Sequence, residues 1–148
     1  MNLSELMVDT KSAWVEYPAY EGLEIELVNL SRPELTALRK RCVSTKFDKA
    51  TRKPVEELNE EKFIAEFTKA TIKNWKGFKL KFLEDFMLVD LSNVDAEAEL
   101  PYTQENAKLL ITNSAEFDTW VNDTVFDLEN FRTGAKKPPV AKTGKVAE

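Results

Sequence analysis

Acidic side chains are the first candidates for chemistry, because the chain contains 26 Asp and Glu residues and no histidine. Asp95, Glu97 and Glu99 place carboxylates at every second position, as at the start of a calcium-binding loop. The glycine and the closing bidentate glutamate of such a loop are absent, so the spacing predicts no calcium site. Other aspartates could pair for acid–base catalysis, but nothing in the sequence brings two of them into one pocket.

Cys42 is the single cysteine of the chain, and it follows three cations, Arg39 to Arg41, that can lower the pKa of a thiol. Because no histidine is available as its base, we interpret Cys42 as a buried core residue rather than a nucleophile. The sequence also lacks a phosphate-binding glycine loop and a dinucleotide-binding motif. We therefore expect no enzyme, and neither a cofactor nor a metal.

Charge is unevenly distributed along the chain, whose net charge is −5. Residues 32–53 contain eight Lys/Arg and two Asp/Glu, whereas residues 82–131 contain twelve Asp/Glu and only Lys108. Such a dipolar protein steers charged partners and is suited to head-to-tail association of copies. Arg39, Lys40 and Arg41 are therefore candidate self-association residues. Nucleic acid is a less favoured partner, because the isoelectric point is about 5.0 and no nucleic-acid-binding motif is present.

The chain is predicted to begin with a β-hairpin, which has strands over 13–17 and 23–30 and a turn over 18–22. Trp14 and Tyr20 lie on this hairpin and are candidates for contacts with partners or other copies, or else ordinary core or surface residues. Ser31, a proline in the first turn and Glu34 form a capping-box pattern that predicts a helix over 32–43. The following segment, 44–58, lacks helical periodicity, which favours a second small hairpin or an ordered loop.

The clearest helix is predicted over residues 59–77, where Phe63, Phe67 and Trp75 recur at helical spacing and Gly77 provides a stop signal. Segment 78–91 is so densely apolar that spacing does not separate a strand pair from a helix, and we favour a helix around 81–89. After a loop rich in carboxylates over 92–100, helices are predicted over 104–112 and from Ser114 onward, with an apolar side that continues through Leu128 and Phe131. Phe126 falls opposite Phe117 on the last helix and is a further candidate for partner contacts.

Together these elements predict an α+β fold, in which N-terminal β-hairpins pack against a mainly helical domain of about four to five helices. We expect one globular domain over residues 1–131 and a disordered basic tail over 132–148, where lysine, proline and glycine are frequent. No apolar run approaches the length of a membrane-spanning helix, and the first residues do not resemble a signal peptide. These features lead us to expect a cytosolic protein without a membrane partner.

Four segments carry a resemblance to a known family: LSRPELTALRKRC, FTKATIKNWKGFK, ELPYTQENAKLLI and EFDTWVNDTVFDLENF. A tryptophan-glycine element at Trp75 to Gly77 precedes a Leu-Pro-Tyr-Thr-x-Glu-Asn helix start and a Phe-x-x-Trp helix. In this order the segments resemble the tail assembly chaperones of long-tailed bacteriophages, over roughly residues 14–131. None of the motifs is catalytic.

The resemblance implies a small protein that coats the tape measure protein, keeps it soluble, and assists assembly of the tail tube. Family members often occur also as a longer form, made by ribosomal frameshifting, whose extra domain binds the tail tube (major tail) protein. This chain would be the short, non-frameshifted form, present in the host cell cytoplasm and absent from the mature virion. A homo-oligomer is compatible with this role. The alternatives are a structural tail or connector subunit of the virion and, less favoured, a nucleic-acid-binding regulator.

Overall fold

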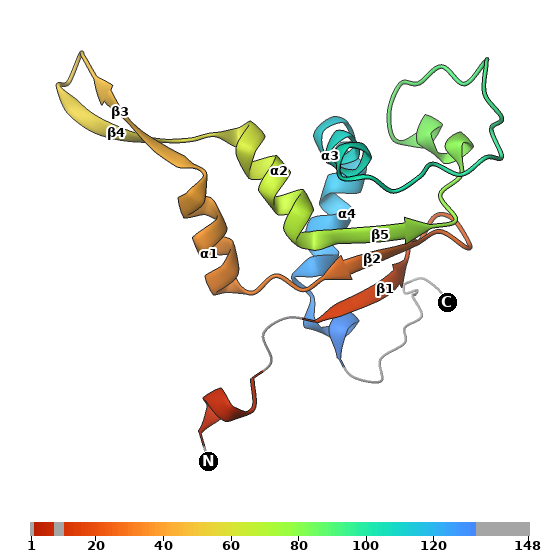
Figure 1. The fold of residues 1–148 in the computed structure, drawn as a ribbon, viewed down its shortest axis with the longest axis horizontal. Coiled ribbons are helices and arrows are strands. Elements are labelled where there is room, and N and C mark those ends of the chain that lie inside the picture. The colour runs from red at the N-terminus through yellow and green to blue at the C-terminus, as the bar shows by residue number, and fades with distance from the viewer. Residues whose placement is uncertain (1, 8–10, 133–148) are drawn as a thin grey trace.

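The computed structural model describes residues 2–7 and 11–132, in which the chain forms five β-strands and four α-helices. The N-terminal hairpin is present, with β1 at Ser12–Glu16 and β2 at Glu24–Val28. A further strand, β5 at Ile72–Lys76, pairs antiparallel with β2 and gives a three-stranded sheet in the order β1-β2-β5 (Figure 1). The α+β prediction is confirmed. Of the predicted tail, residues 133–148 lie outside the described part of the chain.

The helix predicted over 59–77 is correct only for its first part, because α2 spans Glu60–Thr71 and the chain then turns directly into β5. Ile72 and Trp75 both lie inward, as they would in a helix, because the pairing skips Lys73 of β5 and so lets Ile72 face Leu27 and Trp75 face Ile25. The helical spacing of apolar residues over 59–77 therefore does not show where the helix ends and the strand begins. Pairing with β2 supplies the backbone hydrogen bonds of residues 72–76, and the indole Nε1 of Trp75 donates to the carbonyl of Leu100 at 2.8 Å.

One face of the sheet is buried under three helices, α2, α3 at Gln104–Asn113 and α4 at Ala115–Val125. The side chain of Ser114 accepts a hydrogen bond from the amide of Phe117 and so begins α4, as the sequence predicted. The core between the sheet and these helices contains apolar side chains with no solvent exposure: Leu23, Ile25, Leu27, Ile72, Phe78, Phe117, Val121 and Val125. On the opposite face, Trp14 and Glu26 are register partners and remain accessible.

The last helix ends earlier than its apolar pattern suggested. α4 stops at Val125, and Asp127 caps a separate 3₁₀ turn at Leu128–Phe131 by accepting from the amide of Glu129 at 3.0 Å. Phe131 is buried as expected, but Leu128 is exposed, because the new turn changes the direction of its side chain.

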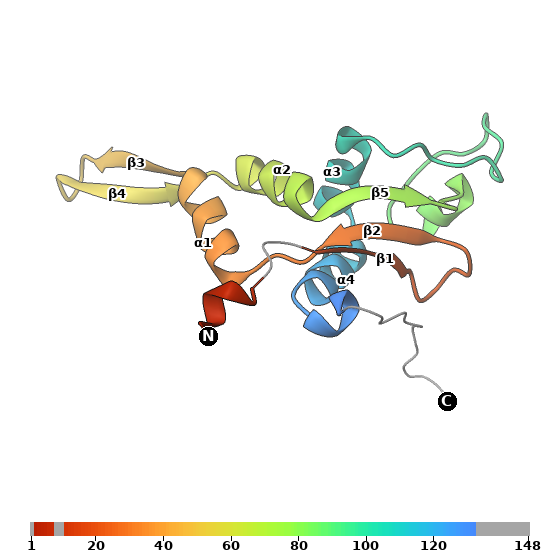
Figure 2. The same ribbon diagram turned by 60° about the horizontal axis from the view of Figure 1, so that its bottom comes forward.

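Helix α1, at Arg32–Arg41, has the predicted capping box at Ser31 and Glu34, and ends two residues before the predicted boundary. It leads into a hairpin of β3 at Val43–Asp48 and β4 at Lys53–Leu58, which confirms the hairpin over the ordered loop. We call residues 43–58 the arm. It projects from the body at one end of the long axis of the molecule (Figures 1 and 2).

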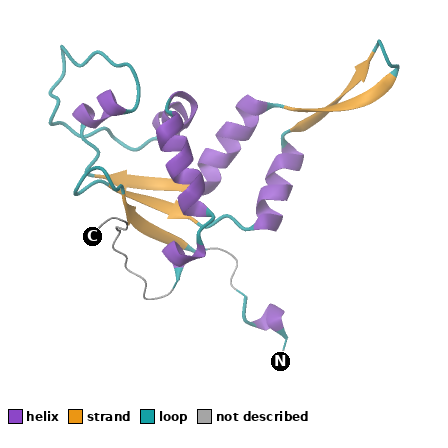
Figure 3. Cartoon of the chain, turned by 180° about the vertical axis from the view of Figure 1, so that it is seen from behind, coloured by secondary structure: helices purple, strands orange, loops and turns teal. Residues whose placement is uncertain are grey.

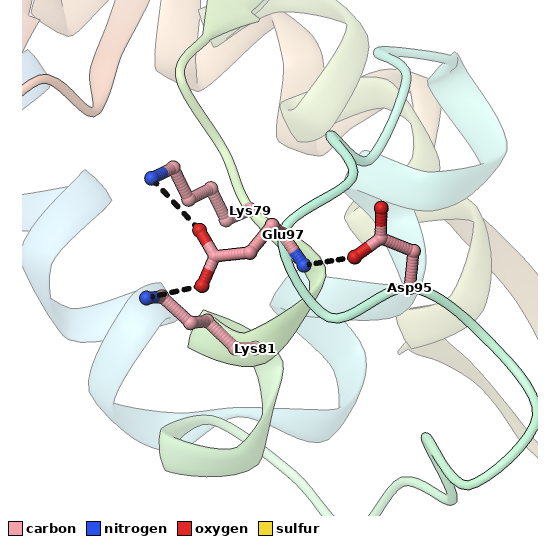
Figure 4. A network of polar contacts seen from close by, with 4 residues as sticks. All are labelled: Lys79, Lys81, Asp95 and Glu97. Carbon is pink, nitrogen blue, oxygen red and sulfur yellow. Dashed lines mark hydrogen bonds and ion pairs between the residues drawn. The ribbon is translucent and has the colours of Figure 1, made fainter.

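The helix favoured for residues 81–89 is only partly correct, because a 3₁₀ helix covers Leu80–Asp85 and irregular backbone continues to Leu100. The amides of Leu80 and Lys81 donate to the carbonyls of Ala98 and Ala96, so the first residues of this 3₁₀ helix are hydrogen-bonded to the returning segment of the chain. Glu97 holds these two segments together by accepting from Lys79 at 3.1 Å and Lys81 at 2.7 Å (Figure 4). This segment forms the end of the molecule opposite the arm (Figures 1 and 3).

Candidate protein-binding surfaces

A groove lies between the residues that follow β1 and the exposed side of α4. It has a volume of about 580 Å³ and is lined by Tyr17, Pro18, Ala19, Ala115, Glu116, Thr119, Trp120 and Asp123. We call it the aromatic groove. The rings of Tyr17 and Trp120 meet edge to face with centroids 4.8 Å apart, and Tyr17 also packs near Phe86 and Phe117 of the core. The groove is thus built on rigid aromatic packing.

Carboxylates border this groove. The phenol of Tyr17 donates to Oε2 of Glu116 at 2.9 Å, a contact between residues 99 positions apart in the chain. Burial, followed by the hydrogen bond to Glu116, raises the pKa of Tyr17 far above its ordinary value, so the phenol remains a neutral donor. Glu116 lies in the first turn of α4, where the helix dipole favours negative charge, and Asp123 lies further along the same helix. An apolar floor with an acidic border suits an apolar segment that also carries Lys or Arg.

A second groove, of about 340 Å³, lies among α2, α3 and α4. Its lining consists of Phe63, Ile64, Phe67, Ile111, Thr112, Asp118 and Asn122. Burial raises the pKa of Asp118, and the amide side chain of Asn122 opposes this by donating to its Oδ1 at 2.9 Å. Because Asn122 also donates to the backbone carbonyl of Asp118, this polar pair is largely satisfied within α4.

The three cations predicted for self-association lie on the exposed last turn of α1, at the base of the arm. Two of them already have partners within the chain. The guanidinium of Arg39 lies 5.2 Å from the ring centre of Phe63, and that of Arg41 pairs with Glu66 at 3.1 Å. Lys40 is exposed beside them.

The three aromatic candidates do not converge on one surface. Trp14 is 43% exposed on the outer face of the sheet, with the ammonium of Lys76 lying 4.6 Å from its ring centre. Tyr20 stacks on Phe82 and donates its hydroxyl to Asp85, so it ties the β1–β2 turn to the 3₁₀ helix. Phe126 is 41% exposed at the C-terminal end of α4.

Sequence reasoning missed two places that expose or border apolar surface. The helical spacing of Trp120 after Phe117 predicts a core position, whereas Trp120 is only partly buried and lines the aromatic groove. Phe47 and Val55 lie in the segment for which the sequence favoured a hairpin or an ordered loop, and they are 66% and 44% exposed on the arm. A signal for the arm existed, because polar Thr45 and Glu56 interrupt the apolar alternation of the two strands.

The residues weighed for chemistry in the sequence do not assemble into a site. Cys42 is buried. Glu97 is paired with two lysines, and Asp95 accepts a hydrogen bond from the amide of Glu97 (Figure 4). Across residues 2–7 and 11–132, no group of three or more His, Cys, Asp or Glu side chains is arranged to hold a metal ion. The same part of the chain contains no helix long and apolar enough to cross a membrane.

Known protein families and proteins provide an independent comparison. The sequence model of the YdaY prophage protein family matches residues 32–142, about three quarters of the chain. The chain belongs to the YdaY prophage protein family. Membership identifies a phage-derived protein, and the match includes the arm and all of α4. No curated protein and no solved structure matches the chain.

Proposed function

We propose that this chain is a tail assembly chaperone that binds the tape measure protein, keeps it soluble, and assists tail tube assembly without catalysis. Two independent findings support the proposal. Membership of a prophage protein family agrees with the phage origin that the tail-chaperone resemblance implies. The described surface offers grooves for a protein segment rather than a cluster of catalytic groups.

The observation that carries the proposal is the aromatic groove. Tryptophan is among the side chains that most often dominate binding energy at protein interfaces, and Trp120 is partly exposed in the groove wall, where it packs edge to face on the buried Tyr17. Elongated tape measure proteins are expected to be largely helical, and an amphipathic helix binds by placing one apolar face in such a groove. The carboxylates of Glu116 and Asp123 would then contact basic residues beside that face.

Reversible binding of this kind suits a holding chaperone. Contacts with a solvent-exposed groove stabilise the soluble partner by mass action, and no nucleotide is needed for release. Polymerisation of tail tube subunits around the tape measure would remove the chaperone by competition. On this proposal the tail tube protein is contacted mainly by a longer form of the chain, the chaperone acts in the host cytoplasm, and neither form remains in the finished particle.

The test is co-expression of the chain with the tape measure protein from the same prophage, followed by measurement of the soluble and co-purified fractions. Thr119→Arg blocks the groove directly, because Thr119 is exposed in its wall and an arginine there would also pair with Glu116 and Asp123. Arginine is the better helix former, so α4 should not be weakened. We expect the wild type to solubilise and retain the tape measure protein, and Thr119→Arg to lose it.

Two matched substitutions control this experiment. Thr36→Arg introduces the same side chain at an exposed position of α1, and we expect normal co-purification. Thr112→Arg blocks the second groove, so loss of binding there with retention by Thr119→Arg would contradict the assignment to the aromatic groove. Aggregation of the tape measure protein with every variant, including the wild type, would contradict the chaperone proposal itself. Mass spectrometry of purified particles adds a separate check, because a structural virion subunit would be present in them.

A further inference from the structure

The arm is exposed on both sides and along both edges. Its register pairs Val43 with Leu58 and Phe47 with Pro54, which places these four residues on one face. Lys46 and Val55 are partners on the other face, where Lys46 also pairs with Glu57 at 2.6 Å. An isolated two-stranded hairpin is only marginally stable in water and presents unpaired edge groups. An arm with an exposed phenylalanine is therefore well suited to be covered by a protein surface.

The outer half of the arm is basic. Residues 46–53 contain Lys46, Lys49, Arg52 and Lys53 against Asp48 alone. Lys46 is largely neutralised by its pair with Glu57, whereas Lys49 and Arg52 lie in the exposed turn that joins the strands. The tip thus combines positive charge with an apolar side chain, Phe47, directly beside it.

The opposite end of the molecule has the complementary character. We call residues 84–99 the acidic loop, because they contain no Lys or Arg and six carboxylates: Glu84, Asp85, Asp90, Asp95, Glu97 and Glu99. Lys79 and Lys81, just before the loop, both pair with Glu97 and leave an excess of negative charge. Two apolar side chains are exposed on the same loop, Leu88 at 103% and Val94 at 50%. The arm and the acidic loop lie at the two ends of the long axis (Figures 1 and 2).

We propose that the arm of one copy docks on the acidic loop of a second copy, so that copies associate head to tail. Phe47 would pack against Leu88 and Val94, and the basic tip would lie against the surrounding carboxylates. Each copy keeps a free arm or a free acidic loop, so the interface is heterologous and can extend beyond a dimer. The inference concerns the chain by itself and does not depend on the binding of a tape measure protein.

A second copy fits the arm better than nucleic acid does. Three carboxylates, Asp48, Glu56 and Glu57, lie on the arm, and they would repel a phosphate backbone. The face that carries Phe47 is apolar from base to tip except for Thr45 and Glu56, as expected for a protein contact. The acidic loop of another copy supplies both the exposed apolar side chains and the excess negative charge that match this arm.

Mixing two variants tests the head-to-tail geometry. Phe47→Ser removes the apolar contact from the arm, and Leu88→Ser removes it from the acidic loop; both side chains are exposed, so the monomer fold should tolerate the changes. In sedimentation velocity at about 0.1 mM protein and low salt, we expect the wild type to form oligomers of graded size and each variant to associate about tenfold more weakly. An equimolar mixture should form a dimer and nothing larger, because only one intact arm–loop pair is available.

One further variant is a control, and two charge variants and a change in salt test the electrostatic part of the interface. Leu128→Ser alters an exposed leucine away from both ends, and should leave oligomers unchanged. The charge contribution is tested with Lys49→Glu and Glu84→Lys: each alone should weaken association roughly threefold or more, and their combination in one chain should restore it. Raising the salt to 1 M should weaken association of the wild type, since the screening length falls from about 10 Å at 0.1 M to about 3 Å.

Several results would overturn the proposal. A wild type that stays monomeric at low salt excludes self-association, and a Phe47→Ser and Leu88→Ser mixture that fails to form a dimer excludes the head-to-tail arrangement. Arm-dependent binding of duplex or single-stranded DNA by monomers, measured by fluorescence anisotropy, would assign the arm to nucleic acid instead. None of these results bears on tape measure binding, which the Thr119→Arg experiment tests separately.

Discussion

Gly77 provides a sharp test of how the sheet and the hairpin turn fit together. The residue ends β5 with a φ of +73°, and a Cβ atom added there would lie 2.1 Å from the carbonyl oxygen of Gly22 and 2.9 Å from its carbon. Both atoms belong to the backbone, so the clash cannot be relieved by rotation of a side chain. Gly77→Ala must therefore separate the end of β5 from the β1–β2 turn.

The cost of this change can be estimated from its two parts. An alanine in the left-handed region costs about 1 kcal/mol relative to glycine. The turn must also move by about 1 Å, which disrupts one or two neighbouring backbone hydrogen bonds such as that from the amide of Tyr17 to the carbonyl of Leu23, and adds about 2–3 kcal/mol. We expect the free energy of unfolding to fall by about 3–4 kcal/mol, or about 12 °C in melting temperature.

Gly22→Ala is the matched control. Gly22 also has a positive φ, +91°, but a Cβ atom there would meet nothing within 4 Å. Only the conformational part applies, so the expected loss is about 1 kcal/mol. Both variants are compared with the wild type by urea unfolding, followed through tryptophan fluorescence and circular dichroism. Equal losses of stability in the two variants would refute the close backbone contact between Gly77 and Gly22.

Three further predictions concern the core, the pH dependence and the arm. Thr68→Val should raise the free energy of unfolding by about 1 kcal/mol, because the fully buried Thr68 hydroxyl has no hydrogen-bond partner within the described residues. Thr71→Val should lower the free energy of unfolding, since the Thr71 hydroxyl donates to a backbone carbonyl at 2.7 Å. Urea unfolding of both variants checks these opposite signs. The wild type should lose stability as the pH rises through about 10, because Tyr17 ionises there in the unfolded chain but not in the folded one. In the same assay, the free energy of unfolding of Tyr17→Phe should fall less between pH 9 and pH 11 than that of the wild type. Replacing the arm by two glycines should change the melting temperature by only a few degrees. The amide of Asn59 already donates to the carbonyl of Cys42 at 2.8 Å, and the loop to be closed is short. A variant that does not fold would show that the arm belongs to the core.

The elements that the sequence predicted well are those specified by local contacts. The capping box at Ser31 and Glu34 lies within a single turn, and it predicted the start of α1 correctly. The first hairpin likewise follows from alternation and a nearby turn. In contrast, β5 depends on pairing with β2, more than 40 positions earlier, and the three-residue spacing of Ile72 and Trp75 is helical and fits the strand only through its register shift. Only the tertiary partner decides between them.

The candidate surfaces were harder to predict for the same reason. The aromatic groove joins Tyr17 to Glu116 and Trp120, which are far apart in sequence, and no local pattern distinguishes a partly buried groove tryptophan from a core tryptophan. The uneven distribution of charge along the chain, on the other hand, is visible from the sequence alone. The structure adds that the arm, with half of the basic residues of segment 32–53, and the acidic loop, with half of the carboxylates of segment 82–131, lie at opposite ends of the molecule (Figure 1).

Hydrogen exchange on the purified complex of this chain with its tape measure protein shows whether the aromatic groove is the binding site. We expect a stable complex in which amides of the turn after β1 and of the first turn of α4 exchange more slowly than in the free chain, because the aromatic groove between them is covered. Failure to form a complex, or a complex in which exchange at these two segments is unchanged, would contradict this expectation.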